Sequence, residues 1–291
     1  MKRKLINWGQ IFTTLLLTFC VTVQPSVAWG LTSGSSLSKT VDLITTEKHT
    51  QTEIVKYVQE HPSGSIYFDA DGKLTGEAHT TEYAQEPVLT APYSSGKLSD
   101  NELSAALNTI KTIRYIAGIS DNIYLSDDYS DLAQASCIVN YVNNKLTHTP
   151  SAPVGMDADL ARKGYTGSRF SNIAWTRWQE NSLKWTILQG WMDDSDVNNL
   201  NTLGHRRWIL NPSMGMTGFG SVTGENGTYT AMYTYDKSNL DNNVTGVCWP
   251  AANTPTSYFT STSPWSISTG EEVKADDITI AMIRIRDSKI W

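Results

Sequence analysis

Apolar residues recur at helical spacing in several parts of the chain. The strongest run follows Ser99 and Glu102, which have the spacing of a capping box, and it stops at Gly118, a residue suited to end a helix. Shorter runs with the same spacing occur before and after it. The pattern predicts helices over residues 50–61, 99–117, 128–143 and 181–193.

Alternation of apolar and polar residues predicts strands. Residues 229–235 alternate tyrosine or alanine with threonine or methionine, and an Asn-Gly turn signal at 226–227 precedes them. Residues 278–286 also alternate, with a slip of one position that indicates a bulge. A hairpin is expected within 65–75. Residues 85–98, which contain two prolines and a glycine, have the composition of a linker.

The amino-terminal segment has the pattern of a secretory signal peptide. Basic residues at 2–4 precede an apolar run over 11–23, and small residues occupy the positions that signal peptidase reads before Ala28. We therefore expect residues 1–28 to be removed after Ala28, which leaves a secreted, extracellular protein. The alternative is a membrane anchor, for which the apolar run is short. No other segment has the sequence of a membrane span.

Composition narrows the classes of function. Of the 291 residues, 40% are hydrophobic and 18% charged, which indicates a folded protein rather than a disordered one. The formal net charge of −6 becomes −9 when the signal peptide, with three basic and no acidic residues, is removed. This acidic balance argues against nucleic acid as a partner. Ten tryptophans and thirteen tyrosines beside six phenylalanines favour a surface that contacts a ligand or another protein.

Two of the three cysteines would remain after cleavage, namely Cys137 and Cys248. In an oxidising compartment these two residues can form a disulfide that closes a long loop. Cys137 also lies on the apolar face of a predicted helix, where a buried thiol is common. The sequence leaves both arrangements open.

Several short segments occur in an order that resembles the CAP superfamily, the cysteine-rich secretory and pathogenesis-related proteins, and in particular its secreted bacterial branch. These segments are 146–148, 171–174, 190–192, 204–210 and 218–220. The resemblance implies an α+β fold, a CAP-type α-β-α sandwich with a mostly antiparallel sheet. The expected organisation is a signal peptide (1–28), a lead-in with a short helix and hairpin (29–98), the CAP-like domain (99–236) and a β-rich extension (237–291) that continues beyond the given sequence.

The resemblance also implies a central cleft that, in many members, holds two histidines and two acidic residues. His148 corresponds to the first histidine and His205 to the second. Ser171, followed by Asn172, stands where the family has a glutamate, and the second acid falls near Asp194. Further candidates come from side-chain chemistry. Trp175 offers a surface for stacking on sugar rings. Arg206 and Arg207 could clamp an anionic ligand, or one of them could be a buried structural residue and the other solvated. The candidate ligand-binding residues are therefore His148, Ser171, Asn172, Trp175, Asp194, His205 and Arg206.

The chemistry of this cleft has alternatives. His148 and His205 could hold a divalent metal such as zinc if Asp193 or Asp194 supplied a third ligand, or they could simply be hydrogen-bonded in a polar cleft. Ser171 could act as a nucleophile beside a histidine or form a local hydrogen bond. The common motifs of hydrolases and nucleotide-binding proteins do not occur in the sequence.

We therefore expect an extracellular or cell-envelope module that binds a glycan, lipid or protein without turnover. Catalytic residues are not assigned. The alternatives are a metal-assisted hydrolase or peptidase that uses the two histidines, and a structural spacer within a larger surface protein.

Overall fold

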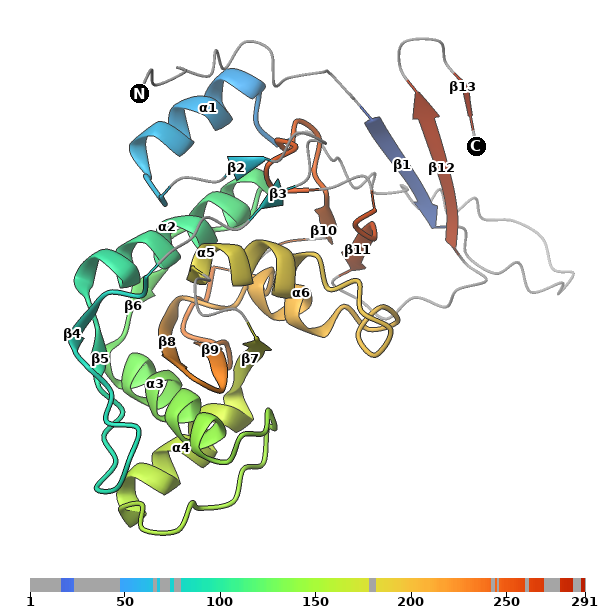
Figure 1. Cartoon of the computed structure of the whole chain (residues 1–291). Helices are drawn as coiled ribbons and strands as arrows, with labels where there is room; N and C mark the ends of the chain where they lie inside the picture. The colour runs from blue at the N-terminus through green and yellow to red at the C-terminus, as the bar shows by residue number, and fades with distance from the viewer. Residues whose placement is uncertain are drawn as a thin grey trace, which may run out of the picture.

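The computed structural model describes most of the chain between residues 48 and 269 and short strands outside it. The described residues are 48–64, 67–68, 74–75, 80–177, 182–241, 244, 246–259 and 262–269, with strand residues 17–23, 278–284 and 289–290. Figure 1 shows the arrangement of these elements. Within this part of the chain, no helix is both long and apolar enough to cross a membrane.

The helices confirm the predictions from apolar spacing and add two that the spacing did not predict. The helices are α1 Gln51–Glu60, α2 Asp100–Ile116, α3 Asp127–Val142, α4 Ala158–Phe170, α5 Leu183–Trp185, the π-helix η2 Thr186–Met192 and α6 Gly204–Ile209. Ser99 caps α2 through its side chain, which accepts a hydrogen bond from the Glu102 amide. Gly118 adopts a φ of +68° after the helix, a conformation that favours glycine. Helices α4 and α6 are the elements that were not predicted.

The described strands form a central four-stranded sheet, a three-stranded sheet (β1-β12-β13) and three two-stranded pairs. They are β1 Leu17–Val23, β2 Tyr67–Phe68, β3 Leu74–Thr75, β4 Tyr83–Gln85, β5 Lys97–Leu98, β6 Tyr124–Leu125, β7 Ser171–Thr176, β8 Met216–Gly224, β9 Gly227–Tyr233, β10 Gly246–Trp249, β11 Ser266–Thr269, β12 Ile278–Arg284 and β13 Lys289–Ile290. The central sheet has the order β6-β8-β9-β7 and is antiparallel except for the β6–β8 pair. The strand predicted over 229–235 largely coincides with β9, and the predicted hairpin is present as the β2–β3 pair.

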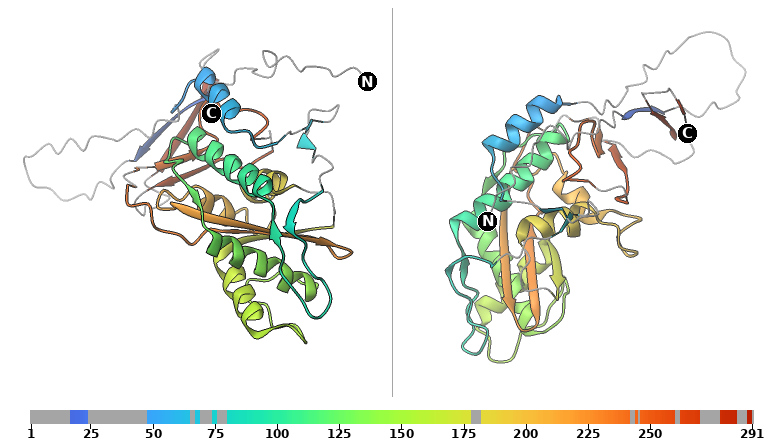
Figure 2. Two further views of the ribbon diagram at one scale, coloured as in Figure 1. Left: turned by 90° about the vertical axis from the view of Figure 1, so that its left-hand side faces the viewer. Right: turned by 45° about the horizontal axis from the view of Figure 1, so that its top comes forward.

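Helices lie on both faces of the central sheet. Figure 2 shows α3 and α4 on one side of β8 and β9, and α2, α5 and α6 on the other. The side chains of β8 alternate accordingly. Phe219 joins the core with α2 and η2, whereas Gly218 and Gly220 face the backbone of α3, where an added Cβ atom would collide with it. This arrangement agrees with the expected α+β class.

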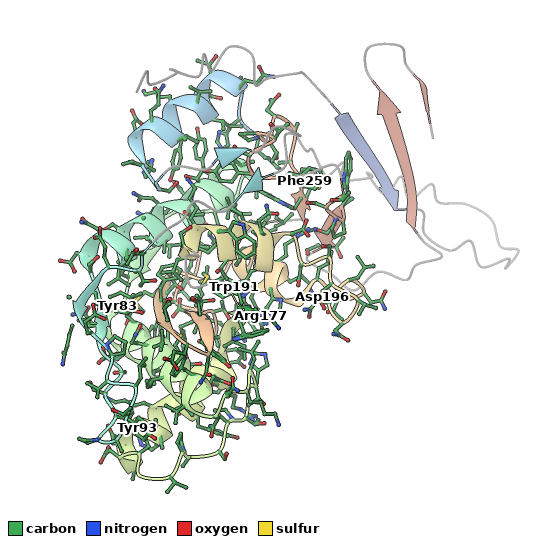
Figure 3. All side chains as sticks on the ribbon, in the orientation of Figure 1. Tyr83, Tyr93, Arg177, Trp191, Asp196 and Phe259 are labelled. Carbon is green, nitrogen blue, oxygen red and sulfur yellow. The ribbon has the colours of Figure 1, made fainter. Side chains whose placement is uncertain are left out.

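One hydrophobic core joins residues from each of the segments expected in the mature chain. It contains Ile54 from α1, Leu98 from β5, Trp191 from η2, and Trp249 and Tyr258 from the carboxyl-terminal region. Trp191 is 1% exposed and lies near the centre of the molecule (Figure 3). The lead-in and the extension therefore pack on the same core as the region between them.

The prediction of a linker over residues 85–98 was wrong. Strands β4 and β5 pair with each other, and Val88 and Ser94 form a further bridge. Gly96 has a φ of +67°, and an added Cβ atom would lie 2.5 Å from the carbonyl oxygen of Gln85, so the two arms of the loop approach closely. The Glu102 carboxylate accepts a hydrogen bond from the Glu82 amide, which joins this loop to α2. Prolines in the loop are compatible with this hairpin-like structure because they lie outside the paired strands.

The predicted bulge in the last strand was also wrong, because β12 pairs with β1 in an unbroken register from Val23–Ile278 to Leu17–Arg284. Strand β1 is the described part of the predicted signal peptide. The rest of residues 1–28, with the expected cleavage position, lies outside the described residues.

Cys137 and Cys248 are free thiols, and both are buried. Burial raises the pKa of Cys137 well above its usual range, and burial raises the pKa of Cys248 to about 11. Because the thiolate is the reactive form, we expect neither residue to react with iodoacetamide at pH 8 in the folded protein, and both to react in urea. Peptide mapping by mass spectrometry measures this. A Cys137–Cys248 cross-linked peptide before reduction would contradict it.

Candidate functional site

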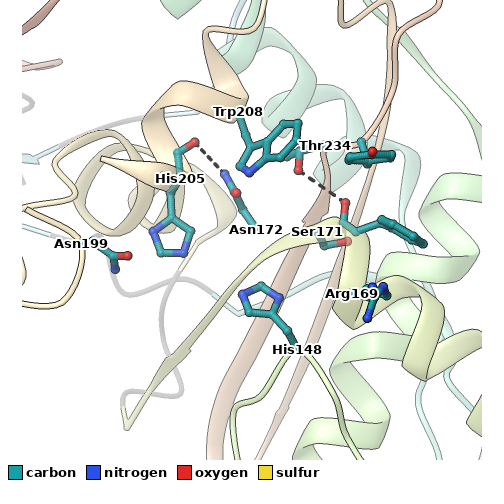
Figure 4. A pocket seen from close by; sticks show the side chains of 11 residues that line it. His148, Arg169, Ser171, Asn172, Asn199, His205, Trp208 and Thr234 are labelled. Atoms are coloured by element: carbon teal, nitrogen blue, oxygen red, sulfur yellow. Dashed lines mark hydrogen bonds between the residues drawn. The ribbon is translucent and has the colours of Figure 1, made fainter. Parts of the chain in front are cut away.

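A cavity of about 280 Å³ opens where the end of α4, the start of β7 and helix α6 meet. Four of the candidate residues line it, namely His148, Ser171, Asn172 and His205. Figure 4 shows the two histidine rings side by side, with His148 coming from the loop after α3 and His205 from α6. The fold therefore brings together side chains that lie far apart in the sequence.

His148 is oriented by a buried polar network between α3 and α4. Its Nδ1 atom lies 2.6 Å from the carbonyl oxygen of Ser168 and must donate a hydrogen bond to it. The Ser168 hydroxyl in turn lies 2.8 Å from the Ser136 hydroxyl and accepts a hydrogen bond from the Asn140 amide at 2.9 Å. Asn140 also accepts from the amide of Thr147, the residue before His148. This network fixes the ring and leaves Nε2 as its remaining polar atom.

His205 is oriented in the same way by a buried carboxylate. Its Nδ1 atom lies 2.8 Å from Oδ1 of Asp194, a residue that is only 1% exposed. The other carboxylate oxygen of Asp194 accepts a hydrogen bond from the amide of Arg206 at 3.3 Å. The Asn172 side chain donates to the carbonyl oxygen of His205 at 3.0 Å, which joins β7 to α6. Asp194 and Asn172 thus position His205, and Asp194 itself does not line the cavity.

Two candidate residues have other places in the structure. Arg206 is 1% exposed, and its guanidinium donates to the carbonyl oxygens of Met192, Asp193 and Pro264 and to the hydroxyl of Ser266. Arg206 therefore joins the end of η2 to the segment at the start of β11, and it does not face this cavity as an anion-binding residue. Trp175 lies at the opposite end of β7 from Ser171, and its indole donates to the carbonyl oxygen of Asn226 beside the β8–β9 turn.

Ser171 has an unusual environment. Its hydroxyl oxygen is buried and has no hydrogen-bond partner among the described residues. It therefore forms neither the local hydrogen bond nor the serine–histidine pair considered from the sequence. A buried hydroxyl without a partner is costly, so Ser171 contributes an unsatisfied polar atom to the cavity wall.

The remaining lining residues were not assigned to the site from the sequence. They are Arg169, Phe170, Asn199, Gly204, Trp208, Thr234 and Tyr235. Trp208 and Tyr235 are partly exposed aromatic residues whose ring centroids lie 5.5 Å apart. The aromatic alternation of residues 229–235 was the available signal for Tyr235, whereas Arg169 and Phe170 lie on α4, which the apolar pattern did not reveal.

The residues present do not form a complete zinc site. A catalytic zinc ion usually has three protein ligands, and the sequence offered Asp193 or Asp194 as the third. Asp194 is engaged with His205 behind the cavity, and Asp193 accepts hydrogen bonds from the hydroxyls of Ser195 and Ser263. Among the described residues, no group of three or more His, Cys, Asp or Glu side chains is placed to hold a metal ion.

Comparisons with known proteins do not identify a relative. No protein-family model, curated protein or solved structure matches the chain.

Proposed function

We propose that this protein is a secreted CAP-like module that binds an extracellular or envelope ligand in the cavity between His148 and His205, without turnover. One observation carries the proposal. Both imidazoles are fixed through Nδ1 and leave Nε2 free of protein partners in the described part of the chain, at a cavity with no carboxylate among its described lining residues. With Nδ1 as the donor, Nε2 of a neutral ring is an acceptor, so two oriented atoms of this kind can accept hydrogen bonds from a ligand's hydroxyl or N–H groups.

The other lining residues support ligand binding. Asn199 and Arg169 add polar groups at the cavity beside the two histidines. Trp208 and Tyr235 supply exposed aromatic surface, which contacts the apolar face of a ligand while its polar groups reach the side chains around it. Pockets with aromatic walls and a few convergent polar groups are typical binding sites.

The hydrolase alternative has one observation in its favour. Histidines that ligate metals commonly donate their second ring nitrogen to a carboxylate or a backbone carbonyl, and both histidines here have such an acceptor. Among the described residues, this alternative lacks a third metal ligand. It also lacks an activated serine there, because Ser171 is not hydrogen-bonded to either histidine. Binding without turnover is therefore the better supported function.

A binding array of glycans, lipids and envelope proteins tests the proposal. We expect His148→Gln and His205→Gln, alone and together, to weaken binding of the captured ligand by about tenfold or more, since each removes an oriented polar contact. His61→Gln is the matched control, because His61 lies at the end of α1 and does not line the cavity. Circular dichroism checks that each variant is folded.

Three results would contradict the proposal. Equal binding by the wild type and the double variant would place the ligand elsewhere. Stoichiometric zinc with cleavage of a substrate, both lost in the double variant, would favour the hydrolase. Absence of any binding partner on the array would favour the structural spacer.

A further inference from the structure

A second cavity adjoins the first and has a volume of about 440 Å³. Gly204 and Trp208 line both cavities, so helix α6 is the shared wall between them. The second cavity is also lined by Arg207 of α6, by residues that follow α6, and by the β10–β11 pair, including Val247 and Ser268. The carboxyl-terminal region thus builds a binding surface next to the first cavity.

The wall between the cavities is firmly held. Arg206 is on the buried side of α6. Its guanidinium donates to the Pro264 carbonyl oxygen, just before β11, and to the hydroxyl of Ser266, the first residue of β11. It also donates to Met192 and Asp193 at the end of η2. Because these hydrogen bonds tie β11 to α6 and η2, the two cavities keep a fixed relation to each other.

The charge of both cavities differs from that of the chain. The sequence has 29 acidic and 23 basic residues, yet no aspartate or glutamate is among the described lining residues of either cavity. Arg169 lines the first and Arg207 the second. Two acidic residues are close in sequence to the lining residues. Asp194 is buried behind His205, and the Asp196 carboxylate accepts a hydrogen bond from the side-chain amide of Asn199. The cavities are therefore suited to negative charge in an otherwise acidic protein.

We propose that the two cavities form one elongated site for an acidic oligosaccharide, which lies across Trp208 and places an acidic group near Arg169 and another near Arg207. This inference rests on the proposed function and names its ligand class. Trp208 is 37% exposed and Tyr235 is 46% exposed, so both rings offer apolar surface to a sugar ring. Arginine pairs well with carboxylate, sulfate or phosphate groups at the ends of such a chain.

Saccharide is favoured over an acidic peptide for a physical reason. The two cavities together offer the rings of Trp208 and Tyr235 and side-chain hydroxyl and amide groups such as those of Asn199 and Ser268, which suit a chain of rings with an apolar face and hydroxyl edges. The single arginine in each cavity and the short distance across one helix suit a chain of several sugar units that spans both cavities. An acidic peptide is therefore an outcome of the test rather than part of the proposal.

The experiment uses oligogalacturonates of two and four units as probes and measures their affinity by calorimetry. Methyl-esterified tetragalacturonate has the same chain without the charge, and tetraglutamate is the peptide probe. The variant Arg207→Ala removes the cation of the second cavity alone, and Arg162→Ala is its control, because Arg162 is an exposed arginine of α4 that lines neither cavity. Trp208→Ala removes the shared ring.

We expect the wild type to bind the four-unit acid about tenfold more tightly than the two-unit acid, because only the longer chain reaches both cavities. Arg207→Ala should remove that advantage and leave the two-unit affinity unchanged, Trp208→Ala should weaken both, and Arg162→Ala should change neither. The esterified chain should bind at least tenfold more weakly than the acid.

Four results would overturn the inference: equal affinity for the two chain lengths, equal affinity for acid and ester, tighter binding of tetraglutamate, or no binding of any acidic probe. If two-unit binding still depends on His148 and His205 while the length effect is absent, the first cavity remains a binding site and only its extension fails. The array described above decides the proposed function separately.

Discussion

Replacing Gly220 with alanine should lower the free energy of unfolding by about 3 kcal/mol, the upper part of the range for an overpacked core. An added Cβ atom would lie 2.5 Å from both the Ala133 carbonyl carbon and the Gln134 amide nitrogen. These are backbone atoms of α3, which cannot turn aside as a flexible side chain would. Helix α3 cannot easily shift away from β8 either, because α4 packs closely against it at Gly164 and Gly167.

Urea denaturation measures this effect, and the chain offers a matched control. At Gly190 in η2 an added Cβ atom would meet its nearest neighbour, the Thr186 methyl group, at 3.6 Å, an ordinary contact. Gly190→Ala should therefore leave stability unchanged or raise it slightly, since alanine favours helix. Equal stability of Gly220→Ala and the wild type would show that α3 does not pack against β8 as described.

Replacing Arg206 with methionine should lower the free energy of unfolding by about 3–5 kcal/mol, as expected when one member of a buried charged network is removed. Methionine fills much of the volume but leaves the carbonyl oxygens of Met192, Asp193 and Pro264 without their donor. Burial lowers the pKa of Arg206 to about 10, so the guanidinium still carries its charge at neutral pH. The fold therefore depends on these hydrogen bonds under ordinary conditions.

The adjacent residue provides the control for this second prediction. Arg207 is exposed, and Arg207→Met should change stability by no more than about 0.5 kcal/mol. Thermal and urea unfolding of the two variants, compared with the wild type, measure the difference. Similar stabilities for Arg206→Met and Arg207→Met would mean that Arg206 does not hold η2, α6 and β11 together.

Local sequence signals worked where an element buries an apolar stripe and failed where it does not. Helix α2 buries leucine and isoleucine at helical spacing, and its cap residue Ser99 is readable from the sequence. Helix α4 buries Ala161, Gly164, Gly167 and Ser168, which are small residues with little apolar character. The close approach to α3 requires small residues, so apolar spacing could not reveal this helix.

For the site, the sequence by itself determined the residue types and their order: two histidines at 148 and 205, and Ser171-Asn172 between them. Only the tertiary structure decided which of these face one cavity, which position others, and that Asp194 lies behind His205. Arg206 and Arg207 show the reason most directly, since they are adjacent and chemically identical. Arg206 is buried because η2 and β11 pack against its side of α6, whereas Arg207 is exposed at the second cavity. Both packing elements come from other parts of the chain, so the local sequence does not distinguish the two arginines.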